Sequence, residues 1–103
     1  MFRRVLDRDA LWAGEMIGVE VGGVPVLLVA VDEQVLAYED RCLHQQVKLS
    51  TGRLDGSVLT CSAHEWSYDV CTGCGLNPDN VRLRALPVRI RGGAIEVDVE
   101  ARS

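Results

Sequence analysis

Two short cysteine–histidine pairs constrain this chain more than any other feature. The first pair is C-x-H, formed by Cys42 and His44, and the second is C-x-x-H, formed by Cys61 and His64. Sixteen residues separate His44 from Cys61, and these two histidines are the only ones in the chain. Thiolates and imidazoles are metal ligands. The pattern therefore predicts a fold that presents two loops side by side and holds a metal between them.

Length and composition predict one globular domain. The chain has 103 residues, of which 48% are hydrophobic, and a formal net charge of −4. Such a chain can bury a core without disulfides or a structural metal to stabilise it, and its negative charge favours protein partners over nucleic acid. The longest apolar run, at 24–31, is too short to cross a membrane, and no signal peptide precedes it. We expect a cytoplasmic monomer, where reducing conditions favour metal ligation over disulfides for the four cysteines.

Alternating apolar residues predict an all-β fold. We expect a three-stranded meander over 15–39, with tight turns at 22–23 and 32–33. The other expected elements are strands at 2–6, 58–60, 66–69, 86–91 and 94–99, one helical turn within 7–12, and loops at 50–57 and 71–80. The expected domain plan is a sandwich base, 1–41 and 81–103, with a metal-binding lobe, 42–80, inserted into it.

The order of the ligands distinguishes between two kinds of metal site. Structural zinc sites group cysteines in one pair and histidines in another, whereas each pair here has one of each. That interleaving suits a two-iron cluster in which one iron takes both thiolates and the other takes both imidazoles. Two ferric ions, two sulfides and two thiolates also sum to zero charge, which lowers the cost of burial. We therefore predict an iron–sulfur cluster, with a structural zinc module as the alternative.

Four segments carry a wider resemblance: DALWAGEM at 9–16, CLHQ at 42–45, CSAHEW at 61–66 and TGCGLNPD at 72–79. The chain resembles the Rieske [2Fe–2S] ferredoxins of bacterial toluene- and alkene-type diiron monooxygenases. The resemblance implies the Rieske fold, an antiparallel β-sandwich with a small inserted cluster-binding lobe. It also implies that Cys42 and Cys61 bind one iron, and that His44 and His64 bind the other through Nδ1.

The same resemblance implies a function. The chain would be a soluble carrier, without catalytic apparatus of its own. It would take single electrons from an NAD(P)H-dependent flavin/iron–sulfur reductase and pass them to a diiron hydroxylase that oxidises aromatic or alkene hydrocarbons. One alternative is the ferredoxin of a ring-hydroxylating dioxygenase, although such ferredoxins are usually Gly-rich where this chain has Gln45 and Gln46. A second alternative is a small subunit of another oxidoreductase, such as nitrite reductase.

Departures from high-potential Rieske proteins concern the reduction potential. Those proteins have a second cysteine in each ligand loop, which joins the loops by a disulfide, where this chain has Val47 and Ala63, and they have a serine where it has Trp66. Both losses predict a potential near the low end of the Rieske range, about −150 mV. Tyr68 is expected either to place its hydroxyl near the sulfur of Cys61, which would raise the potential modestly, or to be a core aromatic.

The residues around the ligands are candidates for docking. The electron would leave through the imidazoles, so both redox partners are expected to bind one tip in brief, mutually exclusive complexes. The tip would comprise Leu43, Gln45, Gln46, the segment 63–66 and the loop near Pro78. Pro78 is expected to stiffen this loop, which would shield the cluster from water. Trp66 is expected to be an interface anchor or a lid, and Glu65 would steer a basic partner face. We expect Trp12 in the core, and Cys71 and Cys74 as ordinary cysteines packed under the lobe.

Overall fold

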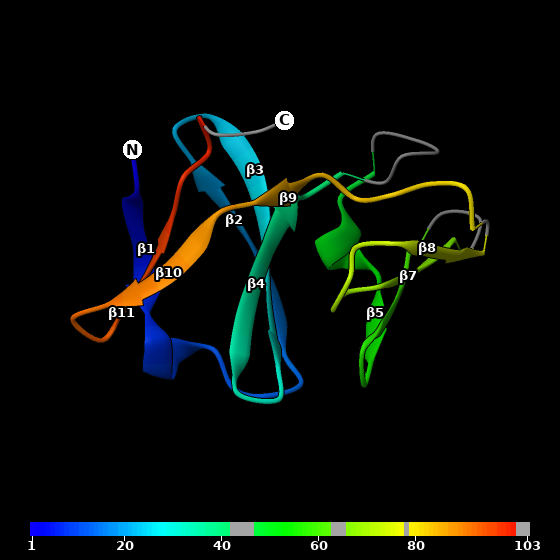
Figure 1. Ribbon diagram of the computed structural model, residues 1–103, viewed down its shortest axis with the longest axis horizontal. Helices are drawn as coiled ribbons and strands as arrows, with labels where there is room; N and C mark the ends of the chain where they lie inside the picture. The colour runs from blue at the N-terminus through cyan, green and yellow to red at the C-terminus, as the bar shows by residue number, and fades with distance from the viewer. Residues whose placement is uncertain (42–46, 63–65, 78, 101–103) are drawn as a thin grey trace.

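Three antiparallel sheets make up this chain (Figure 1). The computed structural model describes residues 1–41, 47–62, 66–77 and 79–100. The first sheet has the order β1-β11-β10, the second β2-β3-β4-β9 and the third β5-β6-β7-β8. The strands are β1 (Arg3–Asp7), β2 (Met16–Val21), β3 (Val24–Val31), β4 (Gln34–Glu39), β5 (Arg53–Asp55), β6 (Val58–Thr60), β7 (Ser67–Asp69), β8 (Gly75–Asn77), β9 (Ala85–Leu86), β10 (Val88–Arg91) and β11 (Ala94–Val97). The expected all-β antiparallel class is confirmed.

Strand β3 is the centre of the molecule because it is buried on both faces. Alternate residues of a strand point to opposite sides of its sheet. Val26 and Leu28 belong to a core cluster shared with the first sheet, whereas Leu27 and Val29 belong to a second cluster shared with the third sheet. This double burial explains why 24–31 is a nearly continuous apolar run. The expected meander is confirmed, since β2 and β4 both pair with β3 in antiparallel register.

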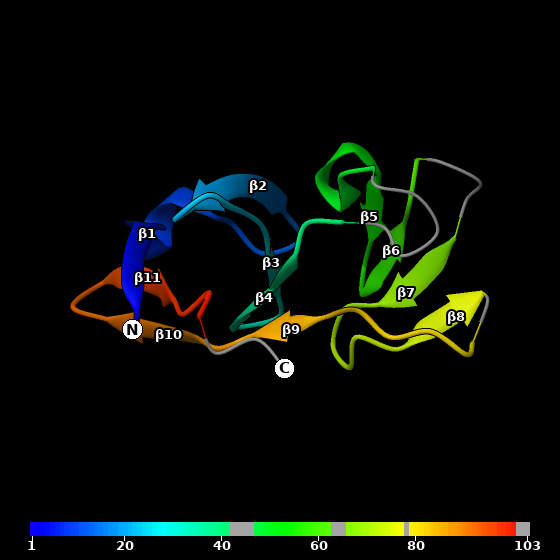
Figure 2. The same cartoon turned by 90° about the horizontal axis from the view of Figure 1, so that it is seen from above.

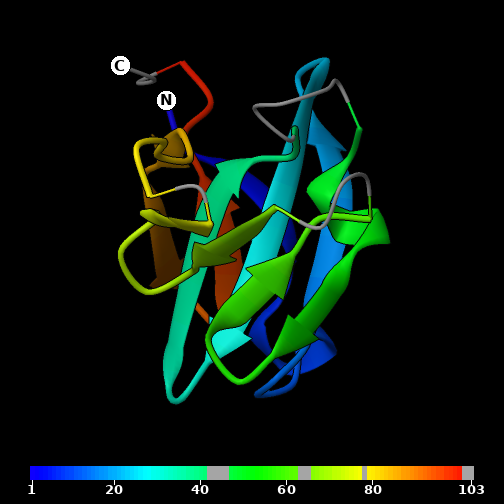
Figure 3. The ribbon, with the colours of Figure 1, turned by 90° about the vertical axis from the view of Figure 1, so that its right-hand side faces the viewer.

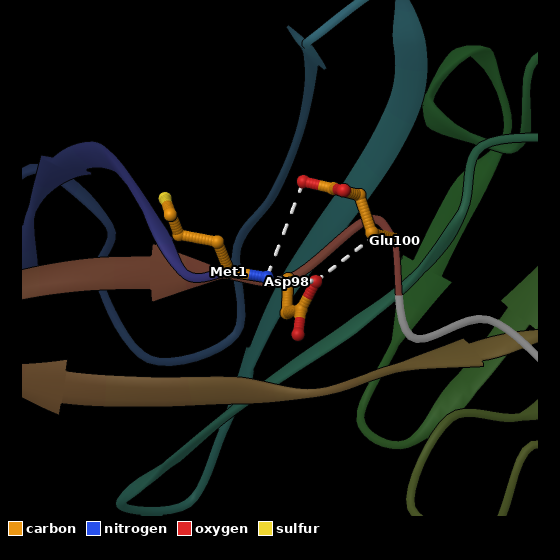
Figure 4. Close-up of polar contacts among 3 residues, drawn as sticks. All are labelled: Met1, Asp98 and Glu100. Atoms are coloured by element: carbon orange, nitrogen blue, oxygen red, sulfur yellow. Dashed lines mark hydrogen bonds and ion pairs between the residues drawn. The ribbon is translucent and has the colours of Figure 1, made fainter.

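The chain crosses from the second sheet to the first at Pro87. Strand β9 pairs with β4, and β10, which begins one residue after Pro87, pairs with β11 instead. The expected single strand over 86–91 is therefore split between two sheets, which Figure 2 shows from above. Near this crossing the amino group of Met1 lies 3.1 Å from the carboxylate of Asp98 and 4.0 Å from that of Glu100 (Figure 4). The N-terminus is thus held by the segment that follows β11.

The third sheet contains two strands that the turn-rich composition concealed. Residues 50–57 and 71–80 were both expected to be loops, and each contains a three-residue strand, β5 and β8. Each pairs with a strand of the central hairpin, β5 with β6 and β8 with β7. Figure 3 looks onto this four-stranded sheet, at the end of the molecule away from β1. Strands this short carry too little periodicity for their pattern to be recognised.

Tyr38 joins the second sheet to the third. It lies in β4, is buried, and donates a hydrogen bond of 2.5 Å from its hydroxyl to the carbonyl oxygen of Val70, at the end of β7. Burial raises the pKa of Tyr38 to about 12, and Cys71 adds to the effect. A raised phenol pKa means that the folded state holds this proton more tightly than the unfolded chain does. The stabilisation is therefore complete below pH 10 and is lost as the pH rises from 10 to 12.

Tyr38→Phe is expected to remove this pH dependence. At neutral pH the variant loses about 1–3 kcal/mol of unfolding free energy, because the buried carbonyl of Val70 loses a donor. Between pH 10 and 12 the free-energy difference between wild type and variant should shrink. Unfolding of the wild type releases the phenolic proton, so rising pH favours its unfolded state, whereas the variant has no such proton. Denaturant unfolding at several pH values measures both effects. Parallel pH profiles of unfolding free energy for the two proteins would show that the phenol of Tyr38 does not cause the loss of stability between pH 10 and 12.

The N-terminal connection confirms one expectation and corrects another. Residues Arg8–Ala10 form a short 3-10 helix, η1, as the expected helical turn over 7–12 required. Trp12, however, is 73% exposed and does not lie in the core. Its indole N–H donates to the carbonyl of Asp9, and its backbone N–H donates to Glu15. Leu11 is buried in its place, because consecutive residues of an extended segment face opposite sides.

Candidate metal centre

Cys61 is the one expected ligand within the described residues; Cys42, His44 and His64 lie outside them. Cys61 directly follows β6 and is 1% exposed, packed in the core cluster with Leu49 and Leu59. Its backbone N–H donates a 2.7 Å hydrogen bond to the carbonyl of Trp66. This bond continues the β6–β7 pairing beyond Thr60 and Ser67, so the hairpin closes at the residue that carries the thiol.

A buried carboxylate, that of Asp40, connects the two ends of the first ligand segment, 42–46. Asp40 directly precedes Arg41 and is 2% exposed. It accepts two hydrogen bonds from Ser50, one from the backbone N–H at 2.9 Å and one from the hydroxyl at 2.7 Å. The side of this pair is covered by Gly18 of β2, where any Cβ would overlap the hydroxyl of Ser50 and the carboxylate of Asp40. The residues on either side of 42–46 are thereby held against the second sheet.

Asp40→Ala is expected to be clearly more disruptive than Ser50→Ala. The first change leaves two donors of Ser50 without their charged acceptor, at about 1.5–3 kcal/mol for a hydrogen bond to a charged group. Ser50→Ala keeps the backbone bond and should cost about 1 kcal/mol. Denaturant unfolding, followed by the visible absorbance of the metal centre, measures both. Equal losses would show that the hydroxyl bond alone fixes the segment.

A second polar contact joins the two ligand segments. The hydroxyl of Thr51 donates to the carbonyl of Lys48 at 2.6 Å, and the same oxygen lies 3.0 Å from the hydroxyl of Ser62. Since the Thr51 proton is used on Lys48, Ser62 is the donor in the second bond. With Val47 and Ala63 in place of cysteines, this bridge adds a non-covalent link between the two segments to the β5–β6 pairing and the packing of Leu49 with Cys61.

A polar pocket opens beside Cys61. It has a volume of about 290 Å³ and is lined by Thr51, Gly52, Arg53, Thr60, Cys61 and Ser62. The described residues alone contain no group of three or more histidine, cysteine or carboxylate side chains that could hold a metal. A buried thiol at such a pocket nevertheless suits a thiolate–metal bond, because thiolates are ligands for iron–sulfur clusters. The described part of the site thus fits the expected cofactor.

Comparison with known protein families tests that fit over most of the chain. Residues 2–87 match the family model of the Rieske [2Fe–2S] domain. This chain belongs to the Rieske [2Fe–2S] family. The cofactor is accordingly a Rieske-type [2Fe–2S] cluster, and the expectation of a cluster instead of zinc is confirmed.

Curated relatives of this Rieske protein are ferredoxin components of oxygenase systems. The chain is 43% identical over 93 residues to the ferredoxin component of the alkene monooxygenase system of Xanthobacter autotrophicus, an alignment covering 89% of this chain and 76% of that protein. It is 31% identical over 103 residues to the ferredoxin component of the naphthalene 1,2-dioxygenase system of Pseudomonas aeruginosa, covering 96% and 99%. The resemblance to oxygenase ferredoxins is therefore confirmed.

Solved structures agree in fold. A complex of reduced oxygenase and oxidised ferredoxin in carbazole 1,9a-dioxygenase contains a chain with a TM-score of 0.84 and 33% identity, which covers 93% of this chain and 91% of its own. The ferredoxin of carbazole 1,9a-dioxygenase from Nocardioides aromaticivorans also has a TM-score of 0.84, at 29% identity, with 93% and 95% covered. The Rieske fold is thus confirmed. No helix among residues 1–41, 47–62, 66–77 and 79–100 is long and apolar enough to cross a membrane.

The aromatic residues after Cys61 lie against the core of the Rieske lobe. Tyr68 is fully buried in the same cluster as Cys61, as the core interpretation requires. Its hydroxyl contact with the sulfur stays a prediction. Trp66 is partly buried and packs against the same hydrophobic core, and its role as interface anchor or lid stays a prediction. The docking candidates Gln45, Gln46, Glu65 and Pro78 lie outside the described residues.

Two expectations about cysteines are wrong in this Rieske protein. Cys71 is exposed and Cys74 is half-buried, so neither packs under the lobe in the core. The reason is that Cys71 and Thr72 lie in an exposed turn at the surface between β7 and β8, beyond the buried Val70. Sequence reasoning also missed Asp40, Ser50 and Gly52. The one signal in the sequence was an aspartate two residues before Cys42, and no local pattern pairs it with Ser50.

Proposed function

We propose that this Rieske protein carries single electrons from an NAD(P)H-dependent flavin/iron–sulfur reductase to a diiron hydroxylase that oxidises alkene or aromatic hydrocarbons. The observation that carries the proposal is the buried thiol of Cys61 at a polar pocket, in a chain of the Rieske family. The 43% identity to an alkene monooxygenase ferredoxin component supports the choice of system. The chain itself performs no catalysis in this proposal, and its location is the cytoplasm.

The proposed ligands are Cys42 and Cys61 for one iron and His44 and His64 for the other. When bound, the cluster supplies one-electron redox chemistry. The cluster would lie in the proposed lobe 42–80, which is inserted into the base formed by 1–41 and 81–103. The protein's own part is positional: Leu49, Leu59 and Tyr68 keep water from the sulfur of Cys61, while Asp40 and Ser50 hold the first segment in place. A dry thiolate side leaves the imidazoles as the route for the electron.

The proposed docking surface is the tip that carries the imidazoles. It comprises 43–46, 63–66 and the neighbourhood of Pro78, and one described neighbour extends it: Leu76 of β8 is 49% exposed. Small interfaces suit carriers that must dissociate quickly, so we expect less than about 1,200 Å² of total buried surface. One tip for two partners makes their binding mutually exclusive.

The test has a composition arm and a kinetic arm. The isolated protein should hold about two irons and two acid-labile sulfides per chain. In stopped-flow assays the reductase should reduce the ferredoxin, and a redox-inert hydroxylase titrated into the mixture should slow that reduction in proportion to its occupancy. Full-rate reduction at saturating hydroxylase would overturn the single docking tip. Failure of the hydroxylase to oxidise the reduced carrier would overturn the function.

A dioxygenase partner is the second candidate, favoured by a specific observation. The naphthalene 1,2-dioxygenase ferredoxin component aligns with this chain over nearly its full length, and the carbazole dioxygenase complex pairs a similar ferredoxin with its oxygenase. The same assay separates the two candidates. The reduced protein is mixed with a diiron hydroxylase and with a ring-hydroxylating dioxygenase, and the faster reoxidation identifies the class of partner.

A further inference from the structure

Two cysteines outside the proposed ligand set lie in one closed loop. The loop runs from Asp69, at the end of β7, to Cys74, just before β8. It is closed by the backbone N–H of Asp69, which donates to the carbonyl of Cys74 at 2.8 Å, and by the N–H of Gly73, which donates back to Asp69 at 2.7 Å. Cys71 is exposed, Cys74 is half-buried, and neither forms a disulfide. The loop therefore presents two thiols at the surface.

Cys74 differs from Cys71 in its contact with a guanidinium. Cys74 and Arg82 pair across an antiparallel β-bridge, and Nη2 of Arg82 donates to Sγ of Cys74 at 3.3 Å. Arg4, Arg41, Arg84 and Arg89 each form a salt bridge with a carboxylate, whereas within the described residues Arg82 forms none. The side chain of Arg82 is exposed. Its remaining N–H groups thus face solvent next to a thiol.

The charges around Cys74 favour its thiolate. The hydrogen bond from Arg82 holds the pKa of Cys74 below its usual value, and a hydrogen bond with Thr72 acts in the same direction. Partial burial and the carboxylate of Asp69 oppose this shift. Tyr38, which also faces this loop, stays protonated at neutral pH because burial raises its pKa to about 12. Thiolates, and not thiols, are the nucleophiles in disulfide exchange.

We propose that Cys74 is a reversible modification site for small disulfides that carry a carboxylate. The thiolate of Cys74 attacks one sulfur of the small disulfide, a new S–S bond joins the two, and the original S–S bond breaks. The second sulfur leaves as a thiolate with the bonding electron pair, so no external oxidant is needed. Arg82 acts on both reactants: its guanidinium donates to Sγ of Cys74, and its remaining N–H groups can bind the carboxylate of the disulfide in two hydrogen bonds. The bound group stays at the loop until another thiol displaces it.

The experiment compares cysteine-to-serine variants of the holoprotein, all of which keep Cys42 and Cys61, by their reaction with two reagents. The anionic disulfide is 5,5′-dithiobis(2-nitrobenzoate), and the neutral one is 4,4′-dithiodipyridine. Cys71→Ser leaves Cys74, Cys74→Ser leaves Cys71, and the double variant measures any attack on the cluster ligands. All three should keep the visible spectrum of the cluster. At pH 7 the anionic reagent should react about tenfold faster with Cys71→Ser than with Cys74→Ser, because Arg82 lies against Sγ of Cys74, where it favours the thiolate and attracts the carboxylate of the reagent.

Arg82→Gln and Arg82→Lys, each in the Cys71→Ser background, separate the role of the guanidinium. Arg82→Gln should slow the anionic reagent more than the neutral one and move the pH–rate profile to higher pH, whereas Arg82→Lys should recover part of the rate. Equal rates for Cys71→Ser and Cys74→Ser would overturn the proposal. So would an unchanged ratio of the two reagents in Arg82→Gln. These rates do not depend on electron transfer, so they test Cys74 apart from the proposed function.

Discussion

Replacing His64 with cysteine is expected to lower the reduction potential by an amount on the order of 100 mV. Substituting imidazole for thiolate raises Rieske potentials to at least about −150 mV, against about −400 mV for plant-type ferredoxins with four cysteines. A single exchange should therefore recover a large part of that difference. The cause is electrostatic: an added thiolate places negative charge beside the iron that receives the electron, and that charge opposes reduction. Spectroelectrochemical titration of the variant against the wild type measures the shift.

His44→Cys provides the matched variant, since the proposed ligand set places both histidines on the same iron. Its potential should fall by a similar amount, while Cys71→Ser should leave the potential unchanged, because Cys71 lies in the exposed turn after β7. Iron and sulfide are counted in every preparation. An unchanged potential in a His64→Cys protein that still holds two irons would show that His64 is not a ligand.

Gly52→Ala is expected to be the most damaging small substitution in the lobe. A Cβ at this position would overlap the carbonyl oxygen of Thr60 and lie 3.2 Å from that of Leu49. Both are backbone atoms that a rotamer change cannot move. Strand β5 would have to separate from β6 one residue before Cys61. We expect a loss of about 3 kcal/mol or more, which for a domain of this size lowers the melting temperature by roughly 15 °C.

Gly56→Ala is the control for this prediction. Gly56 lies in the β5–β6 turn with a φ of +61°, and an added Cβ would have nothing within 4 Å. Its cost is backbone strain alone, about 1 kcal/mol. Thermal loss of the visible circular dichroism of the cluster compares the two variants directly. Similar melting temperatures would mean that the β5–β6 pair shifts without cost, and that the close approach at Gly52 does not position Cys61.

Local pattern was sufficient for the longest strands and for the kind of metal site. The run at 24–31 and the turn at Gly22 and Gly23, both with positive φ, are encoded by neighbouring residues, so β2 to β4 were predicted nearly to the residue. Short strands were not, because β5 and β8 consist of three residues in turn-rich segments. The prediction for Trp12 failed for another reason. Hydrophobicity alone does not say which of two adjacent residues faces the core, and in the structure it is Leu11 and not Trp12 that does so.

By itself the sequence determined the all-β class and the kind of cofactor, and it supplied the proposed ligands with their spacing, since these depend on residue identity and short-range periodicity. Only the tertiary structure decided how the site is supported. Asp40 contacts Ser50, Thr51 contacts Ser62, and Arg82 contacts Cys74 because the fold brings together segments that lie 8 to 11 residues apart and outside the strands. Such contacts depend on backbone register across the fold, and no residue pattern within a single segment carries that information.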